Sequence, residues 1–133
     1  MLVGPDPMRL PPLACRIDPY AFMQLLDIAG QELAPSLMTQ MREDLWQIAR
    51  RIVLALEPVD CDGMRRQTHI LTAIAGSAGA QDLQEAAQDL GKSAHVDPPD
   101  PALLQYHAAK VLEGLFGLIR YTEEAIPQTR SPA

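Results

Sequence analysis

The chain has 133 residues and a formal net charge of −6, and 47% of its residues are hydrophobic although only 5% are aromatic. This length predicts one domain with a core of its own. The negative charge argues against nucleic acid and anionic membranes as partners. No run of about 18 apolar residues is present in the sequence, so we expect no membrane span. The scarcity of aromatic residues favours helices over strands.

The two ends of the chain differ in composition from its middle. Residues 1–16 are rich in proline and lack the basic start and unbroken apolar run of a signal peptide, so we expect a flexible arm on a cytoplasmic protein. Residues 17–126 form the predicted helical domain, and residues 127–133 a disordered tail. Cys15 and Cys61 lack redox or metal-binding spacing and are expected to be free thiols.

The first two predicted helices differ in length. The pair Asp18-Pro19 is a helix start signal, because aspartate caps free N–H groups and proline suits the first turn, and a short helix over residues 20–29 follows. A second, long helix starts near Gln31 and ends at Pro58. Apolar residues recur along it at steps of three or four: Leu33, Leu37, Met41, Leu45, Ile48, Ile52 and Leu56.

Three more helices are predicted after a turn. The third starts near Cys61 or Met64, and Gly76 and Gly79 indicate a break or bend near its end. The fourth covers residues 80–92, with Gly91 as its stop.

The last predicted helix starts at the pair Asp100-Pro101, which repeats the earlier start signal, and ends before Pro127. Four long amphipathic helices joined by short connections predict an all-α protein, an antiparallel up-down four-helix bundle. The short first helix is expected to cap one end of it.

The third predicted helix carries the candidate site, at His69. The residues that share its helix face lie three, four or seven positions away and are Arg65, Arg66, Thr72, Ala73 and Gly76. The apolar residues of this helix lie on another face, so His69 is expected to be exposed. Small residues beside it let another protein approach, and the arginines can attract a phosphoryl group or an acidic partner. Because a neutral imidazole is a nucleophile, this pattern indicates phosphoryl transfer between proteins.

The sequence THILTAIAGSAGAQDLQEAAQDL, residues 68–90, resembles the signature of histidine-containing phosphotransfer domains, the intermediates of bacterial multistep phosphorelays. That signature has a histidine, a leucine two positions on, a run of small residues, Gly-Ala ten and eleven positions on, and leucines in the next helix. The matching positions, all in register, are His69, Leu71, Ala75-Gly76, Gly79-Ala80, Leu83 and Leu90. The family fold is an antiparallel four-helix bundle with an N-terminal helical extension, as predicted for this chain.

The resemblance implies a phosphorelay intermediate. A receiver domain that carries phosphoaspartate would dock over His69, whose outer ring nitrogen would attack phosphorus in line, and the group would then pass to another receiver. Mg²⁺ and the charge-stabilising groups belong to the receiver, so no cofactor or metal of the chain's own is expected. The implied partners are a response-regulator receiver domain and a hybrid histidine kinase. We expect a monomer without kinase activity, because the sequence has no Gly-rich phosphate loop.

The chain departs from the family pattern at Thr72-Ala73, where the family commonly has Lys-Gly. Loss of the lysine removes a positive charge, although Thr72 can donate a hydrogen bond and Arg65 or Arg66 can supply charge. An alternative function is therefore an adaptor that binds a receiver or kinase without being phosphorylated. A third reading is an unrelated helical regulator.

Other polar and aromatic residues have simpler interpretations. His95 is expected to be solvated and His107 to lie at the edge of the bundle. The histidines and cysteines lack metal-ligand spacing, so no metal site is expected. Trp46 either flanks the core or belongs to the docking surface. The fourth helix also carries an acidic strip, interpreted as a solvated face: Asp82, Glu85 and Asp89.

Overall fold

A computed structural model of the chain describes residues 16–129, with side chains placed as far as Ala125. Nearly all of the predicted N-terminal arm, Cys15 and residues 130–133 of the predicted tail lie outside this description. The described residues form five helices and no strand, so the all-α prediction is confirmed. The helices are α1 (Pro19–Ala29), α2 (Ala34–Leu54), α3 (Cys61–Ala78), α4 (Gln81–Ser93) and α5 (Pro101–Thr129).

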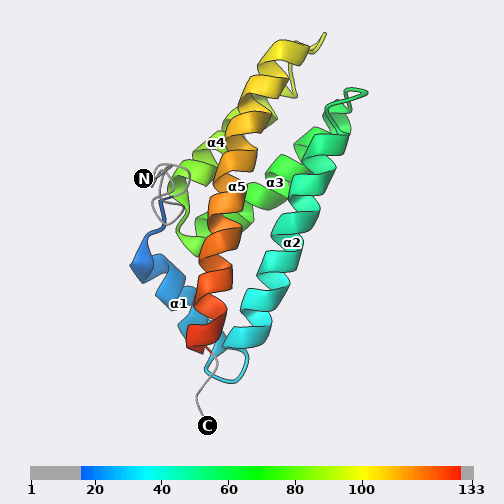
Figure 1. Cartoon of the computed structure of the whole chain (residues 1–133). Helices are drawn as coiled ribbons and strands as arrows, with labels where there is room; N and C mark the ends of the chain where they lie inside the picture. Colours follow the sequence, from blue (N-terminus) through cyan, green and yellow to red (C-terminus); the bar gives the residue numbers. More distant parts are fainter. Residues whose placement is uncertain (1–15, 130–133) are drawn as a thin grey trace, which may run out of the picture.

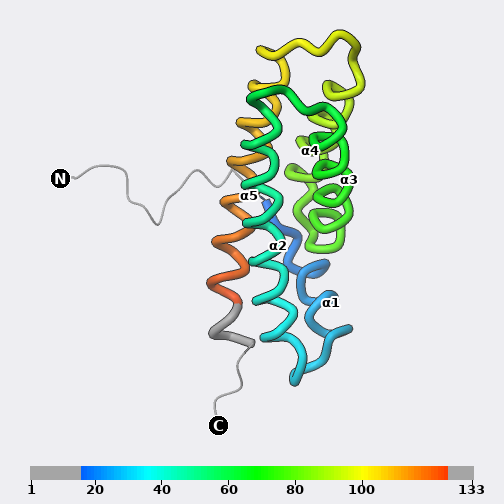
Figure 2. The backbone as a smooth tube through the Cα atoms, turned by 90° about the vertical axis from the view of Figure 1, so that its right-hand side faces the viewer, coloured from blue at the N-terminus to red at the C-terminus, as the bar shows by residue number. Residues whose placement is uncertain are grey.

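The helices pack as a bundle made of two pairs. α2 and α5 are long and lie side by side, while the shorter α3 and α4 form the second pair (Figures 1 and 2). α4 also packs on α5 and α3 on α2, which joins the two pairs. α1 packs against α2 and α3, and in Figure 2 it lies below the α3–α4 pair, beside the part of the long helices that this pair does not reach.

Three aspartates begin three of the helices, as local capping chemistry predicts. Asp18 accepts a hydrogen bond from the backbone N–H of Tyr20 at 3.0 Å, at the start of α1. Asp60 accepts one from the N–H of Gly63 at 2.9 Å, at the start of α3. Asp100 does the same at the start of α5, so both predicted Asp-Pro start signals are confirmed.

Glycine was a less reliable guide to helix ends. α3 runs unbroken through Gly76 and ends at Ala78, where Gly79 adopts a left-handed φ of 78° that closes the helix. α4 continues past Gly91 to Ser93, so the predicted stop is wrong. Gly91 is instead a contact position, since a Cβ there would lie 3.1 Å from the hydroxyl oxygen of Thr68 on α3.

Two further helix ends differ from those predicted from prolines and apolar periodicity. α2 begins at Ala34, later than the predicted start near Gln31. α5 runs past Pro127, where we predicted its end, to Thr129. A proline removes only one backbone hydrogen bond there, close to the end of the helix.

The core lies between the two helix pairs and changes character across them. The α2–α5 side buries three alanines, Ala34, Ala49 and Ala108, but is filled mainly by large side chains: Met38, Met41, Leu45, Ile48, Ile52, Leu104, Val111, Leu115 and Leu118. Small residues make up a larger share of the α3–α4 side, where Met64, Leu71, Leu83 and Leu90 are buried together with Ala75, Ala78, Ala80 and Ala87. Phe22 of α1 packs edge-on against Tyr121 of α5, with ring centroids 4.7 Å apart. Within residues 16–129, no helix has both the length and the apolar character needed to cross a membrane.

Candidate functional site

His69 lies on the middle of α3 with its side chain exposed, as its position in the apolar pattern predicted. Its imidazole makes no hydrogen bond or ion pair with any residue that the structure describes. Both ring nitrogens are therefore open to solvent or to a docking protein. The backbone beneath is held in place, because neighbouring Thr68 and Leu71 are buried in the interior.

The surface of α3 is low on the C-terminal side of His69, because the side chains there are short. Ala73 and Gly76 are exposed, and Thr72 is half-buried. We refer to His69, Thr72, Ala73 and Gly76 as the His69 face. Ile70, which is 40% exposed, adds one large apolar side chain at its margin. A protein surface can therefore come close to the imidazole from this side, because Thr72, Ala73 and Gly76 have smaller side chains than His69.

Arg65 does not belong to the open part of this surface. One of its guanidinium nitrogens donates to the backbone carbonyl of Ala94 at 2.7 Å, and another pairs with Asp62. The bond to Ala94 ties the first turns of α3 to the end of α4, while the pair with Asp62 lies within α3. The prediction that Arg65 is available to a phosphoryl group is not supported, since its donors already serve a tertiary contact that sequence spacing could not reveal.

Arg66 differs from Arg65. It is exposed and makes no hydrogen bond or ion pair within the described part of the chain. Its side chain lines a cavity of about 250 Å³ between α2 and α3, and His69 does not line this cavity. Of the two predicted arginines, Arg66 is thus the one whose guanidinium has no hydrogen-bond or ion-pair partner among the described residues.

The hydroxyl of Thr72, like the guanidinium of Arg65, already makes a hydrogen bond within the chain. It donates to the backbone carbonyl of Thr68, one turn earlier in α3, at 2.7 Å. The hydroxyl of Thr68 does the same to Arg65, at 3.0 Å. Such bonds to the preceding turn are common for threonine in helices. The prediction that Thr72 donates a hydrogen bond to a phosphoryl group is therefore not supported in this conformation.

Gln84 of α4 borders the His69 face, and the sequence analysis did not single it out. A Cβ on Gly76 would lie 2.7 Å from its side-chain nitrogen, so the missing side chain of Gly76 leaves room for the Gln84 carboxamide. That nitrogen also lies 3.5 Å from the backbone oxygen of Thr72, at the limit of a hydrogen bond. The only sequence signal for Gln84 was its position on α4, directly after Leu83 and one turn before Ala87. Both of these neighbours are buried in the structure.

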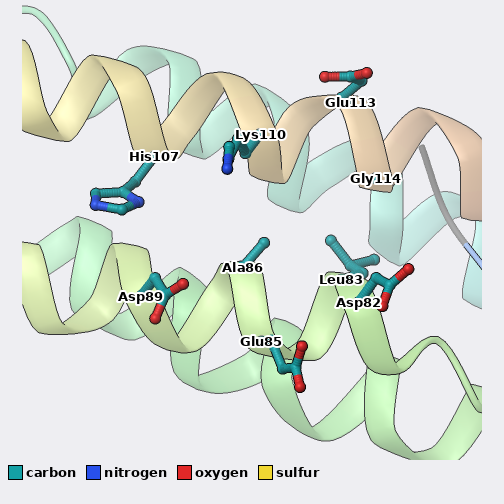
Figure 3. Close-up of a pocket in the computed structure, with 9 residues that line it drawn as sticks. All are labelled: Asp82, Leu83, Glu85, Ala86, Asp89, His107, Lys110, Glu113 and Gly114. Carbon is teal, nitrogen blue, oxygen red and sulfur yellow. The ribbon is translucent and has the colours of Figure 1, made fainter. Parts of the chain in front are cut away.

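A larger cavity, of about 350 Å³, lies between α4 and α5 (Figure 3). The predicted acidic strip of α4 lines it together with Glu113, His107 and Lys110 of α5. Figure 3 shows His107 and Lys110 extending from α5 towards α4. The pKa of Lys110 is raised above its ordinary value, first by Tyr106 and then by Asp89 and Glu113. His69 does not line this cavity, so it is separate from the candidate site.

The remaining predictions concern residues away from the His69 face. His95 is exposed, with its Nδ1 2.8 Å from the carbonyl oxygen of Gly91, and His107 is half-buried at the edge of α5. Trp46 is 43% exposed and packs on Phe116 across the α2–α5 seam, with ring centroids 5.7 Å apart. Cys61 is a free thiol, and residues 16–129 contain no group of three side chains placed to hold a metal ion.

Comparisons with known proteins add nothing to this geometry, since no family model, curated protein or solved structure matches the chain.

Proposed function

We propose that this chain is a phosphorelay intermediate that accepts a phosphoryl group on His69 from a receiver-domain phosphoaspartate and passes it to another receiver. The observation that carries the proposal is an unpartnered, exposed imidazole on the low surface of the His69 face. The register of the phosphotransfer signature across α3 and α4 supports it further. In the proposed fold, α2 to α5 form an antiparallel up-down four-helix bundle and α1 caps it.

The proposed chemistry needs one nucleophile from this chain. The neutral outer ring nitrogen of His69 attacks phosphorus, and an N–P bond forms while the P–O bond to the receiver's aspartate breaks. The aspartate leaves as a carboxylate, and the other ring nitrogen keeps its proton during the attack. Return transfer to a second receiver reverses these steps.

The charge stabilisation in this proposal comes mainly from the receiver. Arg65 is bound to Ala94 and Asp62, and the Thr72 hydroxyl to Thr68. Arg66 remains a candidate for a contact to the phosphoryl group, since it neighbours His69 on α3 and is exposed. The chain therefore contributes the nucleophile and a docking surface, while the receiver and its Mg²⁺ supply most of the positive charge.

Transfer of radioactive phosphate tests the proposal. Receiver domains charged with radiolabelled acetyl phosphate are mixed with the chain, and the label on the chain is treated with acid and with base. A phosphohistidine is acid-labile and base-stable, so we expect label with this stability on the wild type and none on His69→Gln. Equal labelling of His69→Gln, or no labelling of the wild type by any receiver, contradicts the proposal.

A second candidate function, a receiver-binding or kinase-binding adaptor that is not phosphorylated, is favoured by the committed donors of Arg65 and Thr72. Where the family commonly has a lysine, this chain offers a hydroxyl already bonded to its own backbone. The adaptor function predicts receiver binding of the same affinity for wild type and His69→Gln, with no label on either. Calorimetric titration with the charged and uncharged receiver distinguishes the two functions.

A further inference from the structure

A second candidate site lies in the cavity of about 250 Å³ between the last turn of α2 and the first turns of α3. We call it the α2–α3 cavity. Arg51 and Leu54 of α2 line one side, and Asp60, Arg66 and Gln67 line the other. His69 does not line it, and nothing in the proposed phosphoryl transfer uses Arg51 or Gln67.

Gln67 is the most unusual residue of this cavity. Only 3% of its surface is exposed, yet its carboxamide makes no hydrogen bond with any described residue. No polar side-chain atom in the described part of the chain is sealed from solvent without a partner. The carboxamide therefore reaches solvent, and the α2–α3 cavity that it lines is where it does so. An apolar side chain of similar size would fill the position without leaving donors and acceptors unpaired.

Two guanidinium groups flank this carboxamide. Arg51 and Arg66 come from different helices, and both are exposed and without a hydrogen-bond or ion-pair partner among the described residues. One carboxylate, that of Asp60, is present as well, and one of its oxygens accepts the N–H of Gly63. The arginines thus outnumber the acid in the cavity, although the whole chain carries a net charge of −6.

We propose that the α2–α3 cavity binds an oxyanion, a single phosphate or carboxylate group. Guanidinium groups recognise both through paired N–H donors, and the amide of Gln67 adds a donor from the buried side. The volume is below the roughly 300–1,000 Å³ of sites for drug-sized ligands, which favours one small group over a nucleotide. The group comes either from a free anion or from an acidic side chain of a bound protein. This site does not include His69, although it shares Arg66 with the proposed phosphoryl transfer.

The test is a titration of the full ¹⁵N-labelled chain with inorganic phosphate, and separately with acetate, at an ionic strength held constant with chloride. We expect the side-chain amide resonance of Gln67 and the Nε resonances of Arg51 and Arg66 to shift and saturate together. Hydrogen bonds to charged groups contribute about 1.5–3 kcal/mol, so Arg51→Gln and Arg66→Gln should each weaken binding about tenfold or more.

Arg50→Gln is the matched control, because Arg50 is exposed on α2 but does not line the cavity. It should bind like the wild type, and so should His69→Gln, which separates this proposal from the proposed function. Gln67→Leu should keep the helical content and weaken binding. The proposal is overturned if neither anion gives a saturable shift, if Arg50→Gln weakens binding as much as Arg51→Gln, or if Gln67→Leu binds normally. Binding of phosphate alone identifies a phosphate group as the ligand, binding of acetate alone identifies a carboxylate, and comparable binding of both shows that the site accepts either group.

Discussion

The two helix pairs of this bundle are built from side chains of different size. α2 and α5 bury mainly large residues, such as Leu45, Ile52 and Leu115, although Ala49 and Ala108 are buried there too. α3 and α4 meet partly through small ones, including Ala75 and Ala87. At Gly91 even one added methyl group would come within 3.1 Å of Thr68.

Because of this difference, stability and the candidate site depend mainly on different helix pairs. Large buried side chains remove more apolar surface from water, so the α2–α5 pair provides much of the stability of the bundle. Small residues let α3 and α4 approach closely and also leave the outer surface of α3 low around His69. Substitutions in the first pair should therefore act on folding, and substitutions on the outer face of α3 should act on partner binding.

The largest expected effect is that of Leu115→Ala, which truncates a fully buried side chain of α5. We expect the free energy of unfolding to fall by about 2–5 kcal/mol, the usual range for such truncations. Urea denaturation measures the change. Phe116→Ala is the matched control, because the neighbouring Phe116 is 47% exposed and should cost less. A larger loss from Phe116→Ala than from Leu115→Ala would contradict this account of the α2–α5 pair.

The two adjacent arginines of α3 give the next contrast. Arg65→Gln removes the charged hydrogen bond to the Ala94 carbonyl and the pair with Asp62, and should lower the free energy of unfolding by about 1.5–3 kcal/mol. Arg66→Gln removes no contact with a described residue and should change it by less than about 0.5 kcal/mol. Thermal unfolding of both variants measures the difference, and equal losses would show that the distinction is wrong.

Gly79, which follows the last residue of α3, and Gly76 within α3 should respond differently to substitution by alanine. Gly79 has a left-handed φ of 78°, and an added Cβ would lie 2.8 Å from Ala21 and 2.9 Å from the backbone oxygen of Asp18. We expect Gly79→Ala to cost at least about 1–2 kcal/mol, the strain of this conformation alone.

Gly76→Ala is the comparison, because its Cβ would meet only the flexible end of Gln84. Alanine favours helix over glycine, so the free energy of unfolding should stay within about 1 kcal/mol of the wild type. Chemical denaturation of both variants checks the order. A greater loss for Gly76→Ala would mean that Gln84 is held more firmly than its contacts indicate.

Local signals in the sequence predicted much of the fold, but not the contacts between helices. The Asp-Pro pairs at the starts of α1 and α5 act through residues two or three positions away, and their effect was predictable. The exposure of His69 followed from helix periodicity in the same way.

The residues that the sequence misjudged act over longer distances. Arg65 bonds to Ala94, 29 positions further along the chain, and Gly91 fits against Thr68 of another helix. The sequence analysis did not single out Gln67, and only the packed structure revealed a buried amide without a hydrogen-bond partner among the described residues. Contacts of this kind depend on how helices pair, which a periodic pattern does not specify.

The smallest expected effect is that of Thr72→Lys, which introduces a positive charge one turn after His69. Exposed charge pairs contribute about 0.2–1 kcal/mol, so we expect at most a severalfold longer phosphohistidine lifetime or tighter receiver binding. Decay of the label and calorimetric titration measure the two quantities. Ser36→Lys adds the same charge near the start of α2, where Ser36 is exposed, and should change neither. If Thr72→Lys behaves like Ser36→Lys, charge at this position does not limit the transfer.

The most direct test of the central claim compares the three histidines of the chain as phosphoryl acceptors. His69→Gln, His95→Gln and His107→Gln are each incubated with the same radiolabelled receiver, and the base-stable label on each chain is counted. We predict that His69→Gln carries none, while His95→Gln and His107→Gln carry as much as the wild type. Undiminished label on His69→Gln, or loss of label only from one of the other two, would contradict the assignment of His69.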